Sequence, residues 1–241
     1  MKGFFLFFLL ISFSLFSQER ARMKDNIEIR KLQKKNAEKN ILKFKDAILL
    51  VRINLREKEI TYYESFDNNK GADRVKKRQE KKNTQILKAF QENFNFCKTY
   101  FFSMADSRKL FEGEIDSVKF YNFDMNIVNP DGLISNNYFI AEFGSVESDT
   151  TFYYKGQIPS PQNQENPEGY SYYGDEKFSL PALVIRDKDF VQLRGPFPYY
   201  VAYNPGGNIN KRYSNSVSKL DLRLKKYYAK VRINLEEKHT D

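Results

Sequence analysis

Three acidic residues stand where strands of the chain are expected to end. Glu142 closes the apolar segment 138–143, while Asp187 and Asp189 follow the apolar segment 180–186. If the two strand ends meet, these carboxylates could form the acid and base pair that hydrolyses a glycosidic bond. Aspartate is also a favoured turn residue, and we favour this structural role for Asp187 and Asp189.

Other catalytic chemistry has little support in the chain. Its single histidine, His239, lies in a terminal segment of the kind that frays, which argues against a catalytic triad or a multi-histidine metal site. Glycine-rich phosphate loops, a nucleophile elbow and a Cys-x-x-Cys motif are absent from the sequence. The oxygen-bearing residues from Asp67 to Asp73 do not have the spacing of a calcium loop. We therefore expect no metal and no cofactor.

The only cysteine, Cys97, lies between aromatic residues in the segment 94–102. A single cysteine cannot form an intramolecular disulfide. We interpret it as a small buried hydrophobic side chain, with a reactive or intermolecular thiol as the alternative.

The N-terminal segment has the pattern of a secretory signal peptide. Lys2 precedes an apolar run over residues 4–16, and polar residues 17–20 follow it. The apolar core is about a dozen residues long, whereas a transmembrane helix needs roughly 20. We expect residues 1–17 to be removed, which predicts an exported, periplasmic or extracellular protein without a transmembrane segment after cleavage.

Basic residues gather in one expected helix. The whole chain has a net charge of +9, and residues 70–88 alone carry +6. That helix has no apolar stripe before Ile86, so we predict that its preceding cations project into solvent: Lys76, Lys77, Arg78, Lys81 and Lys82. Such a cluster could bind an anionic membrane surface or an acidic polysaccharide, and nucleic acid is not an expected partner of an exported protein. The alternative is a solvated helix face with no ligand.

A polar segment over residues 146–177 contains tyrosines but has no clear period. A segment this long inside a domain is usually functional or disordered. Its tyrosines supply enough apolar area for an ordered insertion that contacts a protein partner or sugar rings. The tyrosines in question are Tyr153, Tyr154, Tyr170, Tyr172 and Tyr173.

The sequence predicts a strand, a helix and a second strand in the first half of the domain. Residues 18–45 are polar and basic, with isolated apolar positions, and we interpret them as a partly helical lead-in outside the core. A continuous apolar run predicts a buried strand over 47–55. Asp73 is the expected N-cap of a helix over 73–95, and a strand over 99–104 follows.

The second half is expected to complete the sheet. We predict loop over 105–137 with one short strand near 118–120, and then a strand over 138–143. A hairpin over 181–193, an edge strand over 199–203 and an amphipathic helix over 217–235 follow. These elements predict a single α/β domain over residues 46–241, with a mixed β-sheet flanked by helices.

The segment Phe178–Val191 resembles the proline, strand, turn and strand of periplasmic thioredoxin-like proteins. The resemblance implies a cis peptide bond before Pro181 and a thioredoxin-like order of elements. The family's Cys-x-x-Cys motif is replaced by Asn54–Glu57, so the resemblance implies a protein without disulfide chemistry. The segment Arg194–Tyr200 resembles uncharacterised secreted bacterial proteins.

These observations predict a non-enzymatic exported protein that binds an envelope protein or an anionic surface. Two alternatives remain open: a carboxylate-based envelope enzyme that acts on a glycan, and a redox-inactive thioredoxin-like protein. Convergence of Glu142 with Asp187 or Asp189 would favour the enzyme.

Overall fold

The computed structural model describes residues 26–130, 137–147, 149–155, 170–173 and 180–240. The chain divides into two compact units, and the larger one comprises residues 37–147 and 177–241. The predicted signal peptide lies outside the described residues.

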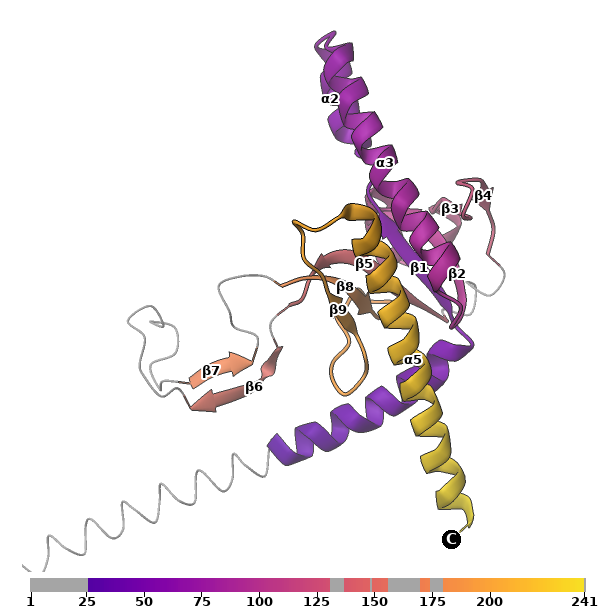
Figure 1. The fold of residues 1–241 in the computed structure, drawn as a ribbon, viewed down its shortest axis with the longest axis vertical. Helices are drawn as coiled ribbons and strands as arrows, with labels where there is room; N and C mark the ends of the chain where they lie inside the picture. Colours follow the sequence, from indigo (N-terminus) through magenta and orange to yellow (C-terminus); the bar gives the residue numbers. More distant parts are fainter. Residues whose placement is uncertain (1–25, 131–136, 148, 156–169, 174–179, 241) are drawn as a thin grey trace, which may run out of the picture. The chain divides into compact units, whose positions relative to one another are not determined.

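The larger unit contains a seven-stranded mixed sheet, which confirms the predicted α/β class. In spatial order its strands are β4 (Ile127–Val128), β3 (Phe120–Tyr121), β2 (Lys98–Ser103), β1 (Ile48–Ile53), β5 (Tyr138–Ser145), β8 (Pro181–Arg186) and β9 (Tyr200–Ala202) (Figure 1). The central strand β1 pairs in parallel with both β2 and β5, and the remaining pairs are antiparallel.

The helices are longer than the sequence predicted. They are a helix over residues 26–45, α2 (Glu57–Ser65), α3 (Asn69–Asn93), α4 (Ser107–Phe111) and α5 (Ile209–Thr240), with short 3-10 turns η1 (Met104–Asp106) and η2 (Ile115–Ser117). The N-cap of α3 is Asn68 and not Asp73 as predicted, because the Asn68 side chain accepts a hydrogen bond from the backbone N–H of Gly71.

The large helices cover one face of the sheet. Leu49 and Val51 of β1 point to this side, where they join Phe90 of α3 and Leu220 of α5 in the main core. Full burial of each such side chain contributes roughly 1.5–3 kcal/mol. The apolar run of β1 is continuous because its other face is covered too.

The opposite face carries a smaller core. Leu50, Phe102 and Ile140 from three adjacent strands pack with Leu110 of α4 and Val118. Much of the segment 105–137, predicted as loop with one short strand, therefore folds into short helices and a two-stranded edge that bury this face.

The second half of the helix over 26–45 corrects a prediction. Ala37, Ile41 and Phe44 are buried in the main core, and the Phe44 ring lies 4.5 Å from that of Phe139. The sequence pattern predicts a position outside the core for this segment, because its apolar residues are few and isolated. The spacing 37, 41, 44 nevertheless puts them on one helix face, and one face is sufficient for packing.

The smaller unit includes an antiparallel pair from the predicted insertion. Strands β6 (Asp149–Lys155) and β7 (Tyr170–Tyr173) pair with a register shift between Asp149 and Tyr153. The insertion thus has ordered structure at these residues, and the rest of 148–177 lies outside the described part of the chain.

The thioredoxin-like arrangement is not confirmed. The predicted return strand over 190–193 makes one isolated bridge, between Arg186 and Gln192, and β9 lies beside β8 instead. Among the described residues the cis peptide bond precedes Pro196, and Pro181 simply begins β8.

Candidate functional site

Glu142 lies between two arginines on the sheet face opposite the large helices. Arg52 of β1 and Glu142 of β5 lie side by side on parallel strands, and Arg186 of β8, which is opposite Ile140, lies diagonally across from Glu142 on the same sheet face. Arg52 Nη1 lies 3.0 Å from Glu142 Oε2, and Arg186 Nε lies 2.6 Å from Glu142 Oε1. Both carboxylate oxygens are therefore engaged in ion pairs, and we call these three residues the arginine clamp.

The arginine clamp continues into the segment after β5. Arg186 Nη1 lies 2.5 Å from Glu147 Oε1 and also donates to the carbonyl of Phe190. Gln192 exchanges hydrogen bonds with the backbone N–H and carbonyl of Glu147. Burial opposes the charge of Arg186, but Glu147 and Glu142 outweigh that effect and raise the pKa of its guanidinium.

This arrangement makes Glu142 unsuitable as a catalytic acid. A catalytic carboxyl must present an oxygen to the substrate, whereas both oxygens of Glu142 are paired with guanidinium groups. The arginine clamp connects three adjacent strands of the sheet and presents no free oxygen to a substrate.

Asp187 and Asp189 belong to the turn after β8. Asp187 Oδ1 accepts hydrogen bonds from the backbone N–H groups of Asp189 and Val191, at 3.0 and 2.9 Å. Asp189 pairs with neighbouring Lys188. Burial, and then Asp189 and Asp187, raise the pKa of Tyr138 at the start of β5, four residues before Glu142.

Four residues along a strand correspond to about 13 Å. The two aspartates thus lie near the Tyr138 end of β5, whereas Glu142 lies in the middle of this strand. Since the Asp187 carboxylate is also occupied by its own turn, these three residues do not form a catalytic pair. Within the part of the chain that the structure describes, no three acidic, cysteine or histidine side chains are grouped to hold a metal ion.

A helical hairpin carries the other predicted site. The first half of α3 packs against α2, and the second half packs against α5 and the sheet (Figure 1). No residue of α2 is buried. A Cβ at Gly71 would lie 2.7 Å from Tyr63 Cδ1, so glycine at this position permits the close contact of the two helices.

One side of α3 is a continuous row of cations, which we call the basic stripe. Its members are Lys70, Arg74, Lys77, Arg78, Lys81 and Lys88, and all six are exposed. Their spacing of three, four and seven residues places them on the same side of the helix. The stripe extends over about 27 Å at the rise of an α-helix.

The basic stripe lacks acidic partners over most of its length. Lys88 lies 3.7 Å from Glu92. The other five cations form no ion pair with any described residue, which leaves their charges available to a ligand. Lys77, Arg78 and Lys81 are among the side chains predicted from the sequence to project into solvent, whereas Lys70, Arg74 and Lys88 are not, although their helical spacing is visible in the sequence.

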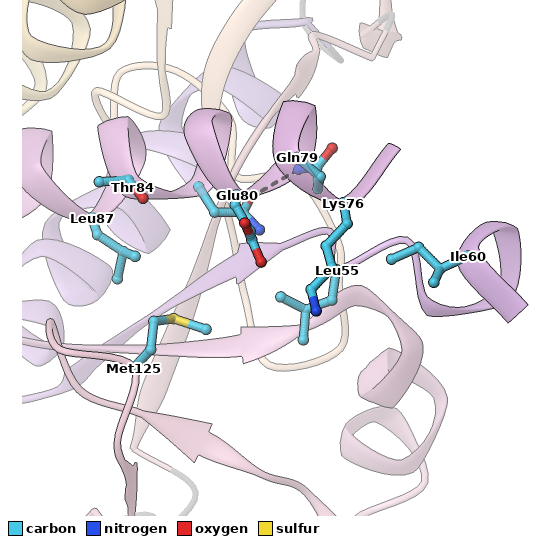
Figure 2. Close-up of a pocket in the computed structure, with 9 residues that line it drawn as sticks. Leu55, Ile60, Lys76, Gln79, Glu80, Thr84, Leu87 and Met125 are labelled. Carbon is cyan, nitrogen blue, oxygen red and sulfur yellow. Dashed lines mark hydrogen bonds between the residues drawn. The ribbon is translucent and has the colours of Figure 1, made fainter. Parts of the chain in front are cut away.

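The remaining two predicted lysines have other environments. Lys76 lines a groove beside α3 (Figure 2). Lys82 is half-buried, and burial followed by the nearby charges of Arg56, Arg212 and Arg78 lowers its pKa. The prediction that all four lysines project into solvent is therefore wrong for Lys82.

The groove lies where β1 ends and has a volume of about 340 Å³. Figure 2 shows Leu55 in its centre, Ile60 and Met125 at its sides, and Glu80 pointing into it. In α/β folds the carboxyl ends of parallel strands are the usual ligand sites. Here the buried amide of Asn83 is occupied, because it donates to the carbonyl of Asn54 and accepts from Gln79.

The predicted tyrosines all lie in the small sheet of the insertion. In its register Tyr153 pairs with Tyr172, and Tyr170 pairs with Lys155. Tyr154 belongs to β6 and Tyr173 to β7. The positions of their side chains fall outside what the structure describes, so their binding role stays a prediction.

Cys97 has the properties of a packed hydrophobic side chain. It contacts the main core, and burial raises the pKa of its thiol to about 12. A nucleophilic cysteine needs a lowered pKa, so this environment argues against a reactive thiol.

Across the described helices, none combines the length and the apolar character required to traverse a lipid bilayer. Comparison with known proteins found no match: no protein family, no curated protein and no solved structure is significantly similar to this chain. Among the residues that the structure describes, the basic stripe is the strongest candidate site.

Proposed function

We propose that this chain is a non-enzymatic, exported binding protein that attaches to an anionic surface through the basic stripe of α3. The observation that carries the proposal is a row of five exposed cations that have no acidic partner among the residues the structure describes. The export step rests on the signal-peptide pattern of residues 1–17.

The expected strength of this attachment follows from the charges. A lysine or arginine near an anionic membrane contributes about 1 kcal/mol. Five such residues give about 5 kcal/mol, which corresponds to a dissociation constant of roughly 0.1–1 mM. Exposed charges act over about 8 Å at physiological salt, so this binding must weaken as salt rises.

The glycan-enzyme alternative has less support. It needs two free carboxylates on opposite sides of a bond, at the separations typical of glycosidases. Both oxygens of Glu142 are paired with arginines, and Asp187 is bound within its turn.

Charge reversal tests the proposal. In Arg74→Glu/Lys77→Glu/Lys81→Glu, binding to vesicles that contain phosphatidylglycerol should fall at least tenfold at low salt. Lys219→Glu/Lys226→Glu/Lys230→Glu is the matched control, because it changes three exposed lysines of α5 and shifts the net charge equally. Circular dichroism checks that both variants are folded.

The control should retain most of the binding. Equal losses in both variants would mean that only net charge matters, and parental binding that ignores salt would remove the electrostatic basis. If the α3 variant binds like the parent, the tyrosine insertion becomes the better candidate.

Export is tested separately. Residues 1–20 fused to a reporter that is active only outside the cytoplasm should give signal, and a silent reporter would contradict the exported location.

A further inference from the structure

The α2–α3 hairpin also exposes two large aromatic side chains. Tyr62 is 62% exposed and Phe66 is 68% exposed, and their ring centroids lie 5.0 Å apart. Tyr62 lies in the last turn of α2 and Phe66 is its C-cap, so the two rings, four residues apart, form one small apolar patch at this end of the helix. Folding does not use this patch, because α2 buries no residue.

Helix geometry places the aromatic patch beside the basic stripe. Tyr63 marks the side of α2 that faces α3, since it lies against Gly71. At 100° per residue, Tyr62 and Phe66 are both rotated in the same direction from Tyr63 around the helix axis, so they lie on one flank of that side. Because α2 and α3 run antiparallel, this flank of α2 and the basic stripe of α3 lie on the same side of the hairpin.

The acidic residues of α2 are distributed differently. By the same periodicity Glu57 and Glu64 fall on the opposite flank of α2, whereas Lys58 falls on the flank of Tyr62. Glu59 lies toward α3 and is paired with Arg56. One side of the hairpin thus combines cations with exposed rings and has no free carboxylate among these residues.

We propose that this side of the hairpin docks on an anionic lipid bilayer, with Tyr62 and Phe66 inserted among the headgroups and the basic stripe on the anionic lipids. This inference rests on the proposed function and identifies its surface. The aromatic patch distinguishes a bilayer from a soluble polyanion, because aromatic side chains favour the membrane interface and a hydrated polymer offers them no apolar layer.

Because the chain has no tryptophan, the fluorescence of a single tryptophan introduced at the patch reports only the environment of that position. Phe66→Trp should shift its emission to shorter wavelength on vesicles of phosphatidylglycerol and phosphatidylcholine in equal parts. Brominated lipids should quench it. Leu222→Trp, at a 52% exposed position of α5, is the control and should show neither change.

A second variant separates bilayer from polymer. Tyr62→Ser/Phe66→Ser should weaken vesicle binding about tenfold and leave binding to soluble polyglutamate unchanged. Circular dichroism verifies folding, which is expected to persist because both rings are exposed.

The outcomes distinguish the two proposals. If vesicle binding is salt-sensitive but the tryptophan at position 66 stays in water, bilayer insertion is wrong and anionic-surface binding stands. If Tyr62→Ser/Phe66→Ser weakens vesicle and polyglutamate binding equally, the rings belong to a general polyanion site and the inference is overturned. If the parent binds neither ligand, the proposed function itself fails.

Discussion

Charged residues occur in this protein in two opposite arrangements. In the arginine clamp, Arg52 and Arg186 share the carboxylate of Glu142, and all three side chains are at most 22% exposed. In the basic stripe, five exposed cations follow one another along α3 without acidic partners in the described residues. The first arrangement satisfies its charges within the fold, and the second leaves them for something outside it.

The difference separates stability from binding. A charged side chain that is shielded from water needs an ion-pair partner, because its desolvation is costly. Removal of one partner therefore lowers the free energy of unfolding. An exposed charge has water as its partner, so its removal costs the fold little. We therefore expect substitutions in the two regions to have opposite consequences for unfolding and for attachment.

The largest expected effect is that of Glu142→Ala. It leaves two poorly solvated arginines without their carboxylate, and Arg52 Nε is already buried without a hydrogen-bond partner in the described structure. Removing one partner of a buried ion pair costs 3–5 kcal/mol, and the partial exposure here places the cost at about 3 kcal/mol. The measurement is the free energy of unfolding in urea.

Glu147→Ala is the control for Glu142→Ala. Its side chain is 52% exposed and also binds Arg186, so its loss should cost less than about 1 kcal/mol. Equal effects of the two substitutions would show that the clamp does not depend on burial.

A smaller loss of stability than that of Glu142→Ala is expected when an uncharged polar group replaces a packed side chain in the core. Cys97→Ser exchanges a packed thiol for a hydroxyl and should destabilise by about 1 kcal/mol without changing vesicle binding. Because the pKa of the thiol is raised to about 12, iodoacetamide should react slowly at pH 8 in the folded protein and fast in urea. Rapid alkylation of folded protein would contradict the packed position.

The order of the main elements could be predicted from the sequence because their periodicity is strong. Two examples are the apolar run of β1 and the apolar face of α5, which includes Leu220 and Leu224. The short helices and strands over 104–128 could not be predicted. They are two to five residues long, which is too short for a periodic pattern, and they are stabilised by the packing of Leu110 and Val118 on the sheet. The same holds for Phe44, whose partners Phe96 and Phe139 are distant in sequence.

The candidate site was predictable only in part. Composition located the cations of α3, and helical spacing defines the stripe. The lowered pKa of Lys82 depends on its burial and also on charges such as that of Arg212 of α5, more than a hundred residues away. The pairing of Glu142 with Arg52 and Arg186 needed the strand order, which local sequence does not contain.

Lys82 differs from the cations of the basic stripe, because it is partly buried and has arginine neighbours. Lys82→Met should stabilise the protein by about 0.5 kcal/mol at pH 7, a small value because solvent screens the half-buried ammonium. Vesicle binding should change less than for Lys77→Met.

The pH dependence of Lys82→Met has a defined sign. Burial, and then the neighbouring arginines, lower the folded pKa of Lys82 below its usual 10.5, so the unfolded state binds more protons between the two values. The contribution of Lys82 to stability therefore rises with pH in that window. The advantage of Lys82→Met over the parent should shrink as pH approaches 10.5, and an advantage that grows with pH would contradict the assignment.

The smallest effect is expected for the basic stripe itself. Lys77 and Lys81 are one helical turn apart, as are Arg74 and Arg78, and like charges at this spacing destabilise a helix by about 0.2–0.5 kcal/mol per pair at low salt. Lys77→Gln/Lys81→Gln should therefore raise the free energy of unfolding by a few tenths of a kcal/mol at low salt, and the gain should vanish at high salt as screening removes the repulsion. The same variant should lose vesicle binding in the low-salt buffer. Opposite signs for stability and attachment in one variant are what a stripe of unpaired charges predicts. A loss of stability instead would mean that these lysines have partners within the fold, and the contrast with the arginine clamp would disappear.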